Sequence, residues 1–146
     1  MKLSVLIAGL CGLALVGAGC GDDDNDTLSY DDTGSEISDI CAEADELGEG
    51  LTGEPENDAP ILEEDIPEFQ AAIDEVADLD VNEELAPIRD DFVAAGEEQV
   101  ALIEEAQQKA EAGDKKAYLK TLEGGQSLER RSNEIANQLG AEECID

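Results

Sequence analysis

Two kinds of side chain in this sequence could take part in chemistry, namely four cysteines and an unusually large number of carboxylates. The 146 residues include 39 Asp or Glu and no His. Without an imidazole the chain has no Ser-His or Cys-His nucleophile pair, no two-His zinc helix and no Glu-x-x-His pair of a di-iron bundle. Adjacent carboxylates such as Glu97-Glu98 are expected on solvated helix faces. We therefore expect no enzyme and no cofactor.

The segment DDDND, residues 22–26, has the spacing of the first ligands of a calcium-binding EF-hand loop. Its first, third and fifth residues are aspartates, as in that loop. The sixth position of the loop requires Gly for a sharp turn but here is Thr27, and the twelfth requires a bidentate Glu but here is Thr33. The pattern predicts no specific metal site, and only weak divalent-cation binding remains as an interpretation.

The first twenty residues have the composition of a leader for export. Met1-Lys2 gives a positively charged start, and residues 3–16, LSVLIAGLCGLALV, are all apolar or small. This run is too short for a bilayer core, which needs about 20 residues, but it fits the hydrophobic region of a secretory signal. Small residues follow at 17–19, and Cys20 comes next. A single membrane anchor that reaches Cys20 is the alternative.

The N-terminal segment has an apolar run, then small residues, then Cys, Gly and a polar segment. In this order it resembles the bacterial lipoproteins. In that group a diacylglyceryl unit is attached to the cysteine thiol, and cleavage makes this cysteine the first residue of the mature chain. The resemblance implies lipidation of Cys20 and cleavage after Gly19. Ala18 and Gly19 fit the pattern, whereas Gly17 stands where Leu is usual. Because two or more acyl chains anchor stably, the resemblance implies a cell-membrane location, on the extracytoplasmic face.

This interpretation divides the chain into a signal peptide at 1–19, a lipidated cysteine with an acidic tether at 20–34, and a helical domain at 35–146. The tether sequence, GDDDNDTLSYDDTG at 21–34, is rich in Asp and has almost nothing to bury. Such a composition predicts a disordered, self-repelling segment.

After residue 34 apolar side chains recur every three or four positions, which predicts helices, and no stretch has the alternation of a strand. A connection rich in Gly and Pro is expected at 48–60. Pro67 is expected near the first turn of the helix that follows it. Four helices are expected: from Ser35 or Ser38 to the connection, from about Leu62 to Val76, from Leu85 or Pro87 to Ala112, and from the N-cap Asp114 to Leu139, with Gly140 as its stop.

Four helices with short links favour an all-α, antiparallel up-down four-helix bundle; a three-helix bundle with an N-terminal helical arm is the alternative.

Four cysteines allow three pairings. In the lipoprotein interpretation Cys11 leaves with the signal and Cys20 carries lipid, so Cys41 and Cys144 remain, and outside the cytoplasm a disulfide is the default for such a pair. An antiparallel four-helix bundle is consistent with this pairing, because the start of its first helix and the end of its last helix lie at the same end of the bundle.

The formal net charge of −31, with only eight Lys or Arg, bears on possible partners. Nucleic acid is excluded because phosphate binding needs clustered cations. Anionic lipid headgroups are disfavoured too, so a membrane link must be a covalent lipid. Six of the cations lie in or beside the expected fourth helix, namely Lys109, Lys115, Lys116, Lys120, Arg130 and Arg131. They either compensate the charge of the acidic helices or form a surface that binds an anionic partner.

These features predict a membrane-anchored extracytoplasmic lipoprotein whose acidic helical domain has a non-catalytic binding or surface-structural role. The alternative is a low-affinity module for a cation or small ligand at the cell envelope. The layout, with a cysteine in the first helix and another after the last, also resembles the small uncharacterised helical lipoproteins of high-GC Gram-positive bacteria, and this resemblance implies no activity. Gly124-Gly125 in the fourth helix indicates close helix packing, a hinge or a small pocket.

Overall fold

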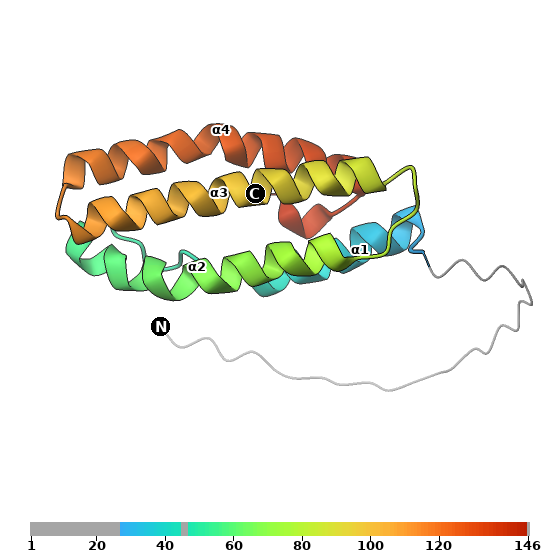
Figure 1. The fold of residues 1–146 in the computed structure, drawn as a ribbon, viewed down its shortest axis with the longest axis horizontal. Coiled ribbons are helices and arrows are strands. Elements are labelled where there is room, and N and C mark those ends of the chain that lie inside the picture. The colour runs from blue at the N-terminus through green and yellow to red at the C-terminus, as the bar shows by residue number, and fades with distance from the viewer. Residues whose placement is uncertain (1–26, 45–46, 146) are drawn as a thin grey trace, which may run out of the picture.

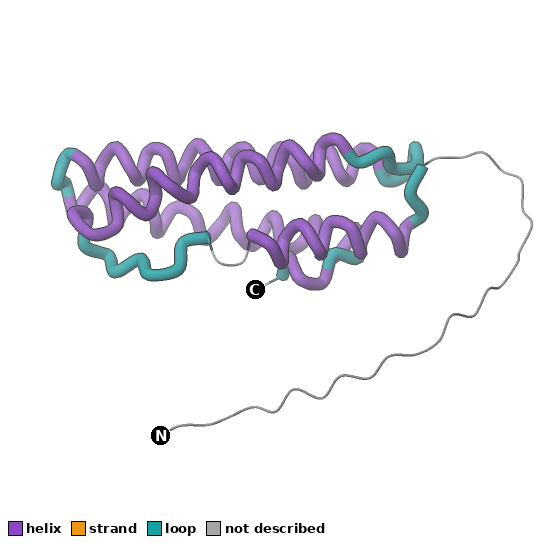
Figure 2. The backbone as a smooth tube through the Cα atoms, turned by 90° about the horizontal axis from the view of Figure 1, so that it is seen from below, coloured by secondary structure: helices purple, strands orange, loops and turns teal. Residues whose placement is uncertain are grey.

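Four helices pack into one bundle in a computed structural model of the chain, which describes residues 27–44 and 47–145 (Figures 1 and 2). The only ladder pairing in this part of the chain is an isolated bridge between Leu28 and Val81. The predicted all-α four-helix bundle is confirmed. None of the described helices combines the length and the apolar composition needed to cross a membrane. The helices are α1 (Tyr30–Ala44), α2 (Pro55–Asp78), α3 (Ala86–Glu111), α4 (Lys115–Leu139) and the short 3-10 helix η1 (Glu142–Cys144).

The bundle has two hydrophobic cores because α1 covers only part of its length. Figure 2 shows α1 over one half of one side of the bundle and loop 47–54 over the other half. Under α1 lies the first core, formed by Ile37, Ile40, Val76, Ala95, Ile135, Ala136, Leu139 and Ala141. Under the loop lies the second core, formed by Leu62, Ala106, Ala110 and Tyr118.

Helix α1 begins at Tyr30, earlier than predicted. Ser29 caps it: its Oγ accepts a hydrogen bond from the Asp32 N–H at 3.3 Å and donates one to the Asp32 carboxylate at 2.6 Å. Residues 30–34, which were expected to belong to the disordered tether, are therefore helical, and Thr33 and Gly34 are buried. The tether prediction is wrong for these residues because the contact that orders them is with the far end of the chain.

Gly34 makes that contact, since it lets α1 pass directly over the C-terminal end of α4. A Cβ at Gly34 would lie 2.8 Å from the carbonyl oxygens of both Leu139 and Gly140, which are backbone atoms with little freedom to move. We expect Gly34→Ala to lower the melting temperature, although Ala is favoured over Gly in a helix by roughly 1 kcal/mol. The measurement is a thermal melt of the full chain in dodecyl maltoside, followed by far-UV circular dichroism.

Gly124→Ala in α4 is the matched control for this substitution. A Cβ at Gly124 would lie 3.8 Å from Leu102 Cδ1, an ordinary contact, so the gain in helix propensity should raise the melting temperature. A rise for both variants would contradict the close approach at Gly34. The neighbouring Gly125 is tighter, at 3.1 Å from Leu102 Cδ2, which favours close helix packing over a hinge for this glycine pair.

Helix α2 begins at Pro55 and so includes part of the segment predicted as a connection. Pro55 occupies a first-turn position, where a missing N–H is tolerated. Pro60 and Pro67 lie inside the helix, so the prediction that Pro67 is near the first turn is wrong. Both are exposed, and the residues four positions before them are also exposed, so the carbonyl groups left without donors remain open to water.

The ends of α3 and α4 agree with the sequence. The Asp114 carboxylate caps α4 by accepting a hydrogen bond from the Ala117 N–H at 3.0 Å. Gly140 ends α4 in a left-handed conformation, with a φ of 73°. These signals operate within a few residues of each other, which is why they can be read without knowledge of the tertiary structure.

A disulfide between Cys41 in α1 and Cys144 in η1 closes the bundle. The two residues are 103 positions apart in sequence and their Cα atoms are 5.2 Å apart. The predicted pairing is confirmed. The bond joins α1, the shortest of the four helices, to η1, which follows the end of α4.

Candidate functional site

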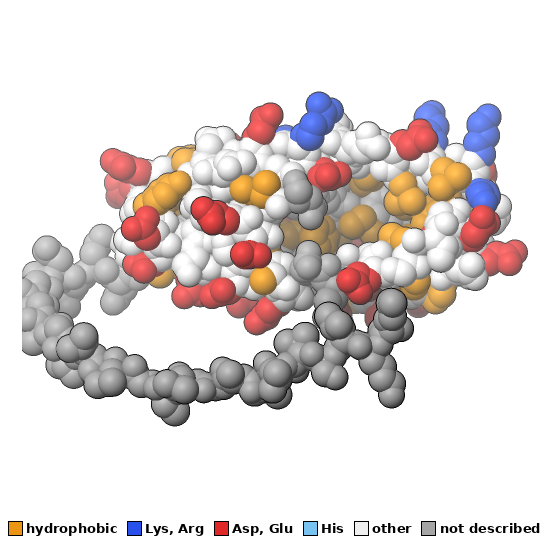
Figure 3. All heavy atoms as spheres, turned by 180° about the vertical axis from the view of Figure 1, so that it is seen from behind, with side chains coloured by type: hydrophobic (Ala, Val, Ile, Leu, Met, Phe, Trp, Pro, Cys, Tyr) orange, Lys and Arg blue, Asp and Glu red, His pale blue; other side chains and the backbone are white. Residues whose placement is uncertain are grey.

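A pocket of about 380 Å³ lies between the two cores. Its volume falls in the range of small-molecule sites, roughly 300–1,000 Å³. Figure 3 shows this side of the molecule, with hydrophobic side chains lying in a hollow. Both phenylalanines of the chain contribute to the lining. The main apolar lining residues are Leu62, Ile66, Phe69, Phe92, Ile103 and Leu122.

The pocket exists because a loop, not a helix, continues from α1 along this side of the bundle. Gly48, Gly50 and Gly53 have positive φ angles, so the loop bends in ways that side-chain-bearing residues rarely adopt. The Asp65 carboxylate of α2 accepts a hydrogen bond from the Gly48 N–H at 2.7 Å and fixes the loop at the pocket wall. Where α1 stops, the space between the helices is left open rather than filled.

One polar group in the pocket lacks a partner. Ser132 of α4 is 9% exposed, and its Oγ is buried without a hydrogen bond. Leaving a buried hydroxyl unpaired costs about 1–3 kcal/mol. Gln99 of α3 also lines the pocket and is half-buried. The Ser132 oxygen is closed off from the open space, so Gln99 is the side chain that could form hydrogen bonds to a bound molecule without giving up bonds within the described part of the protein.

Asn133, another polar lining residue, holds part of the wall together. With its amide oriented to satisfy both partners, the Asn133 nitrogen donates to the carbonyl oxygens of Glu129 and Cys144 at 3.2 and 3.3 Å. Cys41 and Cys144 both line the pocket, so the disulfide forms part of the same wall. The pocket therefore depends on the attachment of α1 and η1 to α4.

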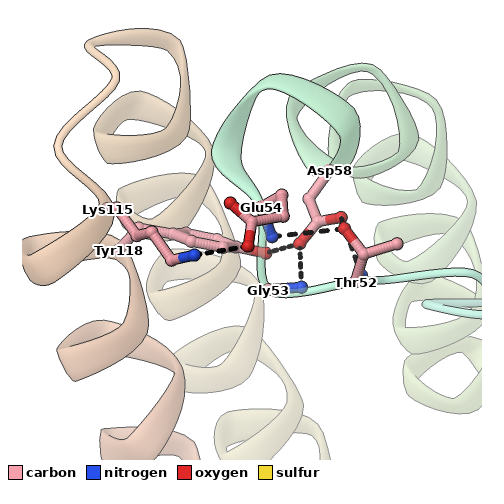
Figure 4. A network of polar contacts seen from close by, with 6 residues as sticks. All are labelled: Thr52, Gly53, Glu54, Asp58, Lys115 and Tyr118. Carbon is pink, nitrogen blue, oxygen red and sulfur yellow. Dashed lines mark hydrogen bonds and ion pairs between the residues drawn. The ribbon is translucent and has the colours of Figure 1, made fainter.

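A buried carboxylate fastens the other end of loop 47–54. Asp58 is 0% exposed and accepts four hydrogen bonds (Figure 4). The donors are the Thr52 N–H at 2.8 Å, the Thr52 hydroxyl at 2.8 Å, the Gly53 N–H at 2.7 Å and the Tyr118 hydroxyl at 2.8 Å. Beside this network Lys115 of α4 forms an ion pair with Glu54. The loop is thus joined to both α2 and α4.

The hydrogen bonds determine the protonation of this buried pair. Burial alone would raise the pKa of Asp58, but the bonds from Thr52, Tyr118 and Gly53 outweigh burial and lower that pKa below its usual value. Burial and the Asp58 carboxylate hold the pKa of Tyr118 well above its usual value. Because both Asp58 oxygens are already engaged by protein donors, we assign this group to loop attachment and not to ligand binding.

Asp58 is a structural residue that was not predicted, although the sequence holds a signal for it. Asp58 lies four residues before Leu62 and therefore extends the apolar face of α2 by one turn. A carboxylate on a buried face requires partners. The expectation that α2 begins near Leu62 concealed this position.

The other predicted site residues have different outcomes. Gly19, Cys20 and the calcium-like aspartates of 22–26 lie outside the described residues. Within 27–44 and 47–145, no group of three or more His, Cys, Asp or Glu side chains is arranged to hold a metal ion.

Half of the basic residues in and beside α4 form ion pairs with neighbouring acids. Lys115 pairs with Glu54, Lys109 with Glu105 at 3.7 Å, and Arg131 with Glu98 at 3.0 Å. Exposed pairs of this kind contribute about 0–1 kcal/mol each. They support charge compensation as the role of these three cations.

Comparisons of the chain with protein-family models, with curated proteins and with solved structures found no match.

Proposed function

We propose that this protein is a lipid-anchored binding protein of the extracytoplasmic membrane face, and that its helical domain holds a small, largely apolar molecule in the pocket between the two cores. The observation that carries the binding role is the open apolar pocket, with the half-buried Gln99 as an uncharged polar group in its wall. Pockets for small ligands combine an apolar lining with a few polar groups that orient the ligand. The resemblance of residues 1–20 to lipoprotein leaders supports the anchor.

A binding role suits this pocket better than catalysis. Nucleophilic serines are activated by an adjacent base that accepts the hydroxyl proton. The Ser132 hydroxyl makes no hydrogen bond to a carboxylate or an amine among the described residues. The carboxylate with the most perturbed surroundings, Asp58, is fully engaged in fastening the loop.

Filling the pocket tests the binding role. We expect Gln99→Phe to occupy the open volume and to weaken the binding of 3-phenylpropanol, a small neutral probe, by about tenfold or more, equal to about 1.4 kcal/mol. Binding is measured by isothermal titration calorimetry on the full chain in phosphatidylcholine nanodiscs, with empty nanodiscs as the blank. Gln108→Phe is the control, because Gln108 lies on the same helix but is exposed and outside the pocket. Binding that is equal in both variants would exclude the pocket as the site.

Replacing the predicted lipidated cysteine tests the anchor. We expect Cys20→Ala to abolish incorporation of labelled fatty acid and to remove the protein from the membrane fraction. Mass spectrometry of the unsubstituted protein should find a diacylglyceryl unit on Cys20 at the mature N-terminus. Cys11→Ala is the matched control and should leave labelling unchanged. Unchanged labelling in Cys20→Ala would reject the proposed anchor without affecting the proposed pocket.

A further inference from the structure

The charged residues that line the pocket are all acidic. They are Asp65 of α2, Glu129 of α4 and Glu143 of η1, and no Lys or Arg is found among the described lining residues. Glu129 and Glu143 are exposed, whereas Asp65 is half-buried and held by its bond from Gly48. Since the whole chain carries a formal charge of −31, no distant excess of cations offsets these carboxylates. The electrostatic potential at the mouth is therefore negative.

The charged and the uncharged polar groups lie at different depths. Glu129 and Ser132 are three residues apart on α4 and so share one face of that helix. Glu129 is exposed, while Ser132 is buried and its hydroxyl has no partner. The rest of the lining is largely apolar and includes Phe69 and Phe92. The site thus combines exposed carboxylates with an apolar lining.

We infer that the ligand of this pocket is a small organic cation, with an apolar body that packs among the phenylalanine and aliphatic side chains and a protonated amine that lies beside Glu129 and Glu143. This inference rests on the proposed binding function. A fatty acid or another anionic amphiphile of the same shape would place its charge against the carboxylates, which is unfavourable at close range.

Three probes with the same carbon skeleton and head groups of different charge test the inference. They are 3-phenylpropylamine, which is a cation at neutral pH, the neutral 3-phenylpropanol, and 3-phenylpropionate, which is an anion. We expect the cation to bind about tenfold or more tightly than the alcohol at low ionic strength, and the anion to bind more weakly than either. The preference should diminish as salt is added, because the mouth is open to solvent. Titration calorimetry on the full chain in phosphatidylcholine nanodiscs measures all three.

A matched pair of double variants separates the pocket carboxylates from the overall charge. Glu129→Gln with Glu143→Gln removes two carboxylates of the pocket, and Glu134→Gln with Glu142→Gln removes two exposed carboxylates from the same two elements outside it. Both variants change the net charge equally. The preference for the cation should fall severalfold in the first variant and remain close to that of the unsubstituted protein in the second.

Each outcome leads to a distinct conclusion. A cation preference that the first double variant loses and the second keeps supports the inference. Binding of the alcohol with no preference for the cation, or an equal loss of preference in both variants, overturns the inference and leaves the proposed function in place. No binding of any probe overturns the proposed function itself.

Discussion

Reduction of the Cys41–Cys144 disulfide is expected to lower the melting temperature of the protein by more than about 10 °C. The bond joins residues 103 positions apart. In the chain-entropy model, closing a loop of this length destabilises the unfolded chain by roughly 4–5 kcal/mol. For a domain near 100 residues, each kcal/mol corresponds to about 4–8 °C. Thermal melts by far-UV circular dichroism, with and without reductant, measure the difference.

The structure indicates which part should loosen first. Helix α1 packs mainly against α2 and η1 and less extensively against α4, whereas α3 packs along α2 and α4. Without the disulfide, α1 keeps only its share of the first core, so hydrogen exchange should increase in α1 before it increases in α3. Since both cysteines line the pocket, reduction should also weaken the binding of 3-phenylpropanol.

The double variant Cys41→Ser with Cys144→Ser provides the control. Its melting temperature should match that of the reduced protein and should not change when reductant is added. If both cysteines of the untreated protein react with an alkylating agent, or if reductant leaves the melting temperature unchanged, the disulfide does not stabilise the bundle as described.

The second large effect is expected at Asp58, where substitution by Ala should destabilise the fold by about 3 kcal/mol or more. The change removes the acceptor for the buried Tyr118 hydroxyl and for the part-buried Thr52 and Gly53 N–H groups. Each buried donor left unpaired costs about 1–3 kcal/mol. Chemical denaturation with urea measures the change in the free energy of unfolding.

Two further variants define the contribution of this network. Tyr118→Phe removes one hydrogen bond to a charged acceptor and should cost about 1.5–3 kcal/mol. Asp74→Ala, at an exposed carboxylate on the same helix, should change stability by about 0.5 kcal/mol or less. Asp58→Ala and Tyr118→Phe should not be additive, because both remove the same hydrogen bond. A loss at Asp58 no greater than the loss at Asp74 would contradict the role assigned to the buried carboxylate.

The same residue should produce a pH dependence of stability. The pKa of Asp58 is lower in the folded protein than in the unfolded chain, where it is about 3.9. Its contribution to stability is therefore present above pH of about 4 and is lost as the pH falls through the folded-state pKa. Protonation of the many exposed carboxylates relieves repulsion over the same range, so the informative quantity is the difference between the unsubstituted protein and Asp58→Ala. That difference should shrink on acidification, and a constant difference would contradict the lowered pKa.

How far the fold can be predicted depends on the range of the interactions that define each element. The ends of α4 follow from Asp114 and Gly140, which act on backbone groups a few residues away. The start of α2 depends on Asp58, whose partner Tyr118 is 60 residues away in sequence. The start of α1 depends on Gly34 and its contact with the end of α4. The capping signals of α4 are therefore readable, whereas the local signals of Ser29 and Pro55 do not identify the starts of α1 and α2 without the distant contacts that bury their first turns.

The pairing of the cysteines could be predicted from the sequence only in part. The bundle topology brings the start of the first helix and the end of the last to one end of the molecule, and the pairing was predicted on this basis. Cys41, however, lies in the last turn of α1 and not near its start, so topology alone does not bring Cys41 to Cys144. Their Cα separation of 5.2 Å, within the range that a disulfide can bridge, depends on how η1 folds back toward α1. The pocket behind them could not be predicted, because the apolar pattern of α2 and α3 is the same whether a neighbouring side chain fills the space or leaves it open.

By itself the sequence determined the helical class, the order and approximate number of turns of the later helices, the strongly negative charge and the absence of His, because these depend on composition and on periodicity within single segments. The tertiary structure alone decided that Asp58 is buried, that residues 30–34 are helical, and that an open pocket separates the two cores. These features arise from packing between segments far apart in the chain, where shape and distance, rather than residue type, determine which groups meet.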